Sequence, residues 1–187
     1  MAKKDQNTTS DYIPFDTALV KGQKLLKNEK TKTIGLYVVV SINLGIRVSD
    51  TLLLTFEQLR GDTLEISETK TGKRRVMAIN DNIKDALTKF DEYYKGLAFK
   101  SQKNSVYSTQ QINRKLKDIF AKEINKGLQI SSHSLRKSFG RKVYDMNPTH
   151  TDALVKLSEL FNHTSPSITR KYLGLRQEEL NDIYMSL

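Results

Sequence analysis

The sequence predicts an α+β fold that is mainly α-helical and contains a small antiparallel β-sheet. Two observations lead to this class. Apolar residues recur at helical spacing along most of the chain, for example between Ile112 and Ile124. Between Thr55 and Ile79 the pattern shortens to strand-like alternation with turn signals. The length of 187 residues fits one domain that can bury its own core.

The composition is that of a soluble globular protein, with 37% hydrophobic and 28% charged residues. No run of about eighteen apolar residues is present to span a membrane. The residues after Met1 lack the apolar segment of a secretory signal. We therefore expect no membrane partner and a cytoplasmic location. Cysteine is absent, which excludes disulfides, zinc–thiolate sites and thiol nucleophiles.

The charge balance favours a polyanionic partner. The chain has 31 Lys and Arg against 21 Asp and Glu, which gives a formal net charge of +10. Nucleic acid is the leading candidate for a chain of this charge. Basic chains also bind anionic membranes and ribosomes, so the charge alone leaves these partners open.

The first helices follow a polar tail. Residues 1–11 begin with a run that has no apolar anchor, and we expect a disordered tail there. Asp16 is expected to cap the first helix. A second helix is predicted over Lys30–Leu44. Its β-branched residues would by propensity alone allow a strand at Tyr37–Ile42, but the long apolar run favours a helix.

A charged residue lies between two apolar helices. Gly45 is typical of a helix end and Ser49-Asp50 of a helix start, so Arg47 is expected in the turn between them. There it would point out of the core, held in position by Asp50. The alternative is an arginine that hydrogen-bonds the last carbonyls of the preceding helix, and the sequence alone leaves both open.

The predicted sheet has two or three strands. The segments FEQLR, TLEISE and RRVMAI are separated by turn signals at Gly61-Asp62 and Thr71-Gly72. Lys70 stands at the last turn, where a flexible hairpin could swing its ammonium group into a neighbouring site. Otherwise this turn is a basic hairpin tip that touches a DNA backbone or only water.

Two further helices are predicted in the middle of the chain. Asp81 can cap a helix that continues to about Lys95. After an exposed loop, Ser108 to Gln111 forms a capping box for the next helix, which ends at Gly127. The outer face of that helix is basic and suits a DNA backbone, although a solvated face is the commoner explanation.

The candidate catalytic residues lie near the C-terminus. His133 and Arg136 are three positions apart, so on a helix they project toward one point. A guanidinium can bind two oxygens of a phosphate, so a phosphodiester is the expected ligand. The hydroxyl of Tyr172 could then attack phosphorus. Taken alone, a His-x-x-Arg pair is more often a solvated helix face.

Helix boundaries frame these residues. Ser131 or Ser132 can cap the helix of the His-x-x-Arg pair, and a helix from about Thr151 to Phe161 leaves His163 just past its end. Ser165-Pro166 begins the short helix that carries the tyrosine. The final segment, LRQEELNDIYMSL, is amphipathic, and it could fold back on its own core or dock on another copy of the protein.

Four motifs in this order resemble the tyrosine recombinase, or phage integrase, family. They are LGIRVSD with Arg47, TKTGKRR with Lys70, HSLRKSF with His133 and Arg136, and NHTSPSITRKY with His163 and Tyr172. The resemblance implies that residues 12–187 form the catalytic domain of this family. It further implies site-specific DNA recombination, as in integration or excision, by cleavage and rejoining of DNA strands.

The resemblance implies the following reaction. Arg47 and Arg136 would clamp the non-bridging oxygens of the scissile phosphate and stabilise the charge of the transition state. Tyr172 would attack phosphorus and form a 3'-phosphotyrosyl link. Lys70 would protonate the leaving 5'-oxygen as general acid.

The remaining matched residues would assist. His133 would help to take the proton from the tyrosine, and His163 would donate a hydrogen bond to the phosphate. Asp50 matches the acidic residue that the family often has three positions after the first arginine. Neither a cofactor nor a metal ion is implied. The implied partner is double-stranded DNA, with a homo-oligomer, a tetramer, on DNA and a monomer in isolation.

The chain departs from the family pattern in three places. Phe161-Asn162 replaces the usual Leu-Gly before the second histidine, and the interval between the two histidines is a few residues longer. The family's N-terminal core-binding domain is not expected before residue 12, so the chain is either a catalytic domain excised from a longer integrase, which we favour, or a small standalone protein.

Two other functions remain open at this stage. Type IB topoisomerases use a similar constellation to relax supercoiled DNA through the same intermediate. A non-catalytic basic DNA-binding module is the second alternative, but binding alone would not require these residues in these places.

Overall fold

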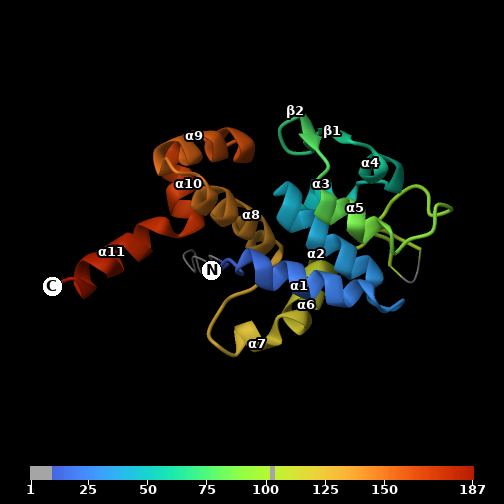
Figure 1. Cartoon of the computed structure of the whole chain (residues 1–187), viewed down its shortest axis with the longest axis horizontal. Helices are drawn as coiled ribbons and strands as arrows, with labels where there is room; N and C mark the ends of the chain where they lie inside the picture. The colour runs from blue at the N-terminus through green and yellow to red at the C-terminus, as the bar shows by residue number, and fades with distance from the viewer. Residues whose placement is uncertain (1–9, 102–103) are drawn as a thin grey trace, which may run out of the picture.

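The computed structural model describes residues 10–101 and 104–187, with the side chains of 176–179 left aside. The predicted class is confirmed, because the described chain is mainly helical with a two-stranded antiparallel sheet (Figure 1). The helices and strands are α1 (Phe15–Leu26), α2 (Lys32–Leu44), α3 (Val48–Leu52), α4 (Phe56–Arg60), β1 (Thr63–Ser67), β2 (Arg74–Ala78), α5 (Asp81–Leu87), α6 (Thr109–Ile119), α7 (Ala121–Ile124), α8 (Ser132–Met146), α9 (His150–Phe161), α10 (Pro166–Leu173) and α11 (Leu175–Met185).

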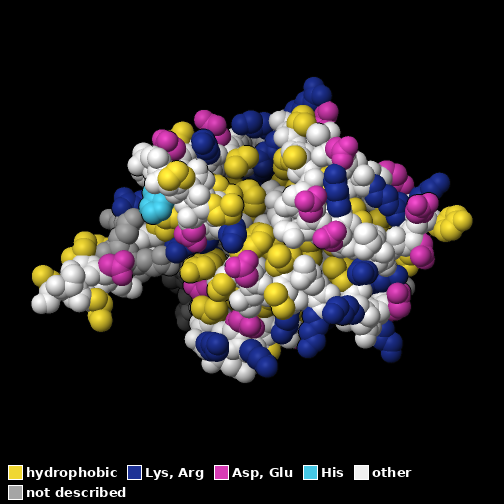
Figure 2. Space-filling view, viewed as in Figure 1, with side chains coloured by type: hydrophobic (Ala, Val, Ile, Leu, Met, Phe, Trp, Pro, Cys, Tyr) yellow, Lys and Arg dark blue, Asp and Glu magenta, His cyan; other side chains and the backbone are white. Residues whose placement is uncertain are grey.

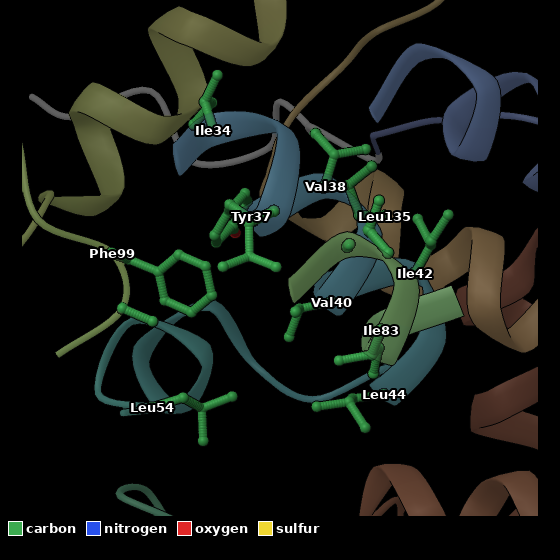
Figure 3. Close-up of a cluster of buried hydrophobic side chains, with 14 of the residues drawn as sticks. Ile34, Tyr37, Val38, Val40, Ile42, Leu44, Leu54, Ile83, Phe99 and Leu135 are labelled. Atoms are coloured by element: carbon green, nitrogen blue, oxygen red, sulfur yellow. The ribbon is translucent and has the colours of Figure 1, made fainter. Parts of the chain in front are cut away.

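Helix α2 forms the centre of the main core. Nearly every one of its residues is buried, which explains why its sequence is apolar without a polar face. Figure 3 shows its side chains meeting Leu54, Ile83, Phe99 and Leu135 from other parts of the chain. The helix prediction for this segment is therefore confirmed, and the strand alternative at Tyr37–Ile42 is wrong.

Two glycines allow α1 and α2 to pack with their backbones close together. A Cβ atom on Gly22 would lie 2.9 Å from Val39 Cγ2, and one on Gly35 would lie 2.8 Å from the Gly22 carbonyl oxygen. Larger residues would force the two helices apart. Since α2 leads directly into Arg47, this packing fixes where the first candidate arginine leaves the core.

The sheet is a single hairpin. Strand β1 pairs with β2 in the register Thr63 to Ala78 through Ser67 to Arg74. The segment FEQLR, predicted as a strand, is instead helix α4, because the Thr55 side chain accepts from Gln58 N and the Gln58 side chain accepts from Thr55 N. This capping box satisfies the first N–H groups of a helix and outweighs the short alternating pattern.

The C-terminal helices build a second, smaller core. Leu157, Phe161, Leu173 and Leu175 are buried together against α8. The close approach depends on Gly140, where a Cβ atom would lie 2.6 Å from Leu173 Cδ2. In Figure 1, α9 and α10 lie on one side of α8 and the β1–β2 hairpin lies on the other. Helix α8 therefore lies between the C-terminal helices α9 and α10 and the β1–β2 hairpin.

Several predicted boundaries shift. Helix α1 has Pro14 at its N-cap, with Asp16 in the first turn, and α5 ends at Leu87 rather than near Lys95. Residues 1–9 of the predicted tail lie outside the described residues. Its last two residues are held in place, since Lys137 Nζ donates to Ser10 O at 2.6 Å and Asp11 N donates to Gln129 O at 2.8 Å.

Helix α11 extends away from the rest of the molecule in Figure 1. Its described apolar side chains Leu180, Ile183, Tyr184 and Met185 are exposed. Within the described ranges, no helix has the length and apolar character needed to cross a membrane.

Among the glycines with a left-handed backbone conformation, Gly45 is expected to be the one at which substitution by alanine destabilises the protein most. Gly45 has φ of +60°, and a Cβ atom there would clash with the ring of Phe139. Gly45→Ala should lower the free energy of unfolding by about 2–5 kcal/mol, from left-handed strain plus overpacking. Thermal and urea unfolding measure this loss.

Gly72→Ala is the matched control. Gly72 has a similar φ of +67° but nothing within 4 Å of the added Cβ atom. It should cost only the strain, about 1–2 kcal/mol. Equal losses in the two variants would contradict the close contact between Gly45 and Phe139.

Candidate active site

Arg47 leaves the core at the junction of α2 and α3. Gly45 ends α2 in the left-handed conformation, and Arg47 is the N-cap residue of α3. Its Nη1 atom donates to Glu68 Oε2 at 2.6 Å, and its Nη2 atom donates to the Phe161 carbonyl oxygen at 3.3 Å. The guanidinium is thus held between the hairpin and the end of α9.

Arg136 lies beside it on α8 and is only 5% exposed. Its Nη1 atom donates to Gly45 O at 2.9 Å and its Nη2 atom to Phe161 O at 3.1 Å. Burial lowers the pKa of Arg136 to about 10, and the positive charge of Arg47 adds to the lowering, while Tyr172 opposes it. The group therefore stays charged at neutral pH, although little water surrounds it.

The carbonyl oxygen of Phe161 joins the two arginines. Phe161 is the last residue of α9, and the C-cap residue that follows it, Asn162, is left-handed with φ of 55°. Carbonyls in a last helical turn have no partner within the helix and carry partial negative charge. This single oxygen accepts from both guanidiniums, so both are already aimed at one point where an anionic oxygen could bind.

His163 and Tyr172 pack against the ring of Phe161. The ring centroids of His163 and Tyr172 are 5.3 Å apart, and each lies 5.5 Å from that of Phe161. His163 Nδ1 is 2.9 Å from Thr169 Oγ1 on the tyrosine's own helix, α10. Burial, with Arg136 and Arg47, lowers the pKa of His163, so its ring is neutral at pH 7.

The hydroxyl group of Tyr172 is buried, and among the described residues it has no hydrogen-bond partner of good geometry. Burial raises the pKa of Tyr172 to about 12, although the charges of Arg136 and Arg47 act in the opposite direction. In this conformation the tyrosine is protonated. It needs a base, and stronger contact with the cations, before it can act as a nucleophile.

His133 lies in the first turn of α8, on the exposed surface. It borders a surface hollow lined by Ser10, Asn113 and Ser131. Neighbouring residues remove part of the water around its ring and so lower its pKa, and the charges of Arg136, Lys137 and Arg47 lower it further. The ring is therefore neutral at pH 7 and able to accept a proton.

Lys70 is exposed in the turn between β1 and β2, and it forms no hydrogen bond or ion pair with any residue that the structure describes. The sequence predicts that Asp50 holds Arg47 in position. Asp50 Oδ1 accepts from Thr69 N at 2.9 Å and so anchors the turn beside Lys70. The carboxylate that contacts Arg47 is Glu68.

Two buried groups of this site were missed in the sequence. Glu68 is 1% exposed and contacts Arg75 as well as Arg47. Lys137 is 7% exposed, and its Nζ atom lies 5.2 Å from the centroid of the Tyr172 ring. An acidic residue directly before a strongly basic turn was a usable signal for Glu68. Nothing in the sequence separates Lys137 from the many exposed lysines.

The structure thus brings Arg47, Arg136, His163 and Tyr172 together around Phe161, with His133 and Lys70 at the margins. Figure 2 shows Lys and Arg side chains along the edge between α9 and the β1–β2 hairpin. Among the described residues, no three His, Asp or Glu side chains are grouped as a metal site would require.

The chain belongs to the phage integrase family, whose model matches residues 22–179. It is 31% identical over 167 residues to the probable integrase/recombinase YoeC of Bacillus subtilis (strain 168), covering 87% of this chain and 88% of YoeC. The family resemblance inferred from the four motifs is therefore confirmed.

Solved structures share the fold. The crystal structure of XerA recombinase matches with a TM-score of 0.66 and 18% identity, over 100% of this chain and 66% of that one. The XerH site-specific recombinase bound to difH matches with a TM-score of 0.64 and 21% identity, over 92% of this chain and 53% of that one. The chain thus spans two thirds or less of these solved chains.

The buried tyrosine gives a pH-dependent prediction. In the free protein, the hydroxyl of Tyr172 should ionise at about pH 12, above its ordinary value of 10.0, because burial disfavours the anion. The measurement is the ultraviolet absorbance of tyrosinate during a pH titration of wild type and of Tyr172→Phe. The difference between the two curves should lie near pH 12. A difference near the ordinary value would show that the hydroxyl is not buried.

Proposed function

We propose that this chain is the catalytic domain of a tyrosine-type site-specific recombinase, formed by residues 12–187. It would cut and rejoin DNA strands through a 3'-phosphotyrosyl intermediate. The observation that carries the proposal is the convergence of Arg47 and Arg136 on one oxygen, next to Tyr172. Membership of the phage integrase family supports the same reaction.

The first step is exchange of the oxygen between the arginines. A phosphodiester carries a full negative charge, so a guanidinium holds its oxygens, often two at once, more strongly than it holds a neutral carbonyl. The non-bridging oxygens of the scissile phosphate would therefore replace the Phe161 carbonyl on Arg47 and Arg136. Both guanidiniums then stabilise the charge that develops during the transfer.

Nucleophilic attack follows once Tyr172 loses its proton. His133 is neutral at pH 7 and is proposed to take that proton, directly or through water. The tyrosine oxygen forms a bond to phosphorus while the bond from phosphorus to the 5'-oxygen breaks. Lys70 gives a proton to that leaving oxygen, and His163 donates a hydrogen bond to the phosphate. Attack of a new 5'-hydroxyl on the phosphotyrosine reverses these steps and rejoins the strand.

The substrate would be double-stranded DNA, and the reaction would take place in the cytoplasm. A tetramer that assembles on the DNA from monomers would carry it out. XerH bound to difH and a lambda integrase dimer bound to a core site are matched structures in complex with DNA. The net charge of +10 is in keeping with a DNA partner. The exposed apolar residues Leu180, Ile183 and Met185 of α11 support contacts between copies.

The proposed reaction is tested with a suicide substrate, a nicked duplex whose cleaved end diffuses away and traps the covalent intermediate. The substrates form a panel of candidate attachment sequences. Wild type should form a protein–DNA adduct that survives a denaturing gel. Tyr172→Phe should form none, because it lacks the hydroxyl that attacks phosphorus.

Tyr93→Phe is the matched control, since Tyr93 is 91% exposed and lines a surface pocket that contains none of the candidate catalytic residues. It should form the adduct at the wild-type rate. An adduct that persists in Tyr172→Phe would contradict the assignment of the nucleophile.

A further inference from the structure

We propose that Glu68 is a positioning residue that sets Arg47 and the turn carrying Lys70 in one arrangement. This inference rests on the proposed function, and it adds a group that lies outside the four motifs. One carboxylate would thereby link an arginine that binds the phosphate to the lysine that protonates the leaving group.

Glu68 is buried to an extent that is unusual for a carboxylate in a hairpin. It is 1% exposed, whereas its neighbours Ser67 and Thr69 are exposed. A buried carboxylate is retained only where cations and hydrogen-bond donors replace its water. Burial alone would raise the pKa of Glu68, but the hydrogen bonds from Thr71 and Arg47 and the charge of Arg75 outweigh it and lower the pKa. The group is therefore ionised at neutral pH.

Each contact of this carboxylate leads to a different part of the site. Oε2 accepts from Arg47 Nη1 at 2.6 Å and from Thr71 Oγ1 at 2.7 Å. Oε1 lies 3.0 Å from Arg75 Nε on strand β2. The same oxygen that holds the arginine thus also holds the residue immediately after Lys70.

The backbone of Glu68 closes the turn around the lysine. Its N–H donates to Lys73 O at 3.0 Å, and its carbonyl accepts from Gly72 N at 2.7 Å. On the other side, Asp50 Oδ1 accepts a hydrogen bond from Thr69 N. The backbone on both sides of Lys70 is therefore fixed, while its long side chain remains free to reach the DNA.

Removal of the charge would disturb both groups together. Arg47 and Arg75 repel each other, and the carboxylate between them compensates for this. Without it, Arg47 would keep only its contact with the Phe161 carbonyl, the position that the phosphate must take. A displacement of about 1 Å in a catalytic group can cost on the order of 100-fold in rate.

A simpler alternative is that Glu68 only stabilises the hairpin. The two roles are separated with two nicked substrates that differ in one atom at the scissile bond. The first has the ordinary 5'-oxygen, and the second has sulfur in its place. A thiolate leaves without protonation, because a thiol has a pKa of about 8.5, so the second substrate does not need the general acid.

Glu68→Gln keeps the shape of the side chain and removes its charge. On the oxygen substrate we expect adduct formation to slow by on the order of 100-fold. On the sulfur substrate the loss should become smaller but remain clear, because Lys70 is then unnecessary whereas Arg47 is still misplaced. Lys70→Ala should recover fully on sulfur, and Arg47→Ala should not recover. Glu65→Gln, in an exposed pair with Arg74 of the same hairpin, is the matched control and should cleave both substrates like wild type.

Three results would overturn the inference. No loss in Glu68→Gln would exclude a positioning role. An equal loss on both substrates would mean that Glu68 acts only through Arg47. Complete recovery on the sulfur substrate would mean that it acts only through Lys70. If Glu68→Gln does not fold, Thr71→Val is used instead, because it removes the contact of Glu68 Oε2 with the turn, and the bond from Lys73 N within the turn, but leaves the contact with Arg47 in place. It should recover fully on sulfur, and a loss that persists there contradicts the proposed link.

Hydrogen exchange tests the local claim without cleavage. In Glu68→Gln the amides of Thr71 and Gly72 should exchange faster than in Glu65→Gln, and equal rates would refute the inference. If wild type forms no adduct on either substrate, the proposed function fails. The exchange rates still decide whether Glu68 holds the turn.

Discussion

The structure of the site depends on one carbonyl oxygen, that of Phe161. It accepts hydrogen bonds from Arg47 after α2 and from Arg136 on α8, so it joins the main core to the C-terminal helices. Two guanidiniums of like charge would separate without an acceptor between them. The end of α9 supplies that acceptor, and it brings Phe161, His163 and Tyr172 to the same place.

Burial of charge is the second constraint, and it explains the state of each group. Removal of water lowers the pKa of Arg136 to about 10 and raises the pKa of Tyr172 to about 12. The free protein therefore has charged arginines and a protonated, inactive nucleophile. Glu68 offsets the positive charge on one side, and a DNA phosphate would offset it on the other. The substrate would thus complete an arrangement of charges that the protein alone leaves unbalanced.

Much of this was predictable from the sequence, because local signals determine it. Gly45 at a helix end, the capping box at Ser108 and Ser165-Pro166 at a helix start predicted boundaries that the structure confirms. The strand prediction for FEQLR was wrong because five residues are too few to distinguish the period of a strand from that of a helix. The capping box at Thr55 favours the helix. An acidic residue before a basic turn was a signal for a buried Glu68, but nothing in the sequence indicated its contact with Arg47, since the two residues meet only when the hairpin packs beside the start of α3. The same holds for Asp50, whose partner is the backbone of the turn.

The central claim is that the two arginines bind the scissile phosphate in place of the Phe161 carbonyl. The most direct measurement is a crystal structure of the Tyr172→Phe variant bound to a nicked attachment sequence. Non-bridging phosphate oxygens should lie within hydrogen-bond distance of both Arg47 and Arg136, with the carbonyl of Phe161 no longer accepting from the pair. A phosphate bound elsewhere, with both arginines still on that carbonyl, would contradict the account.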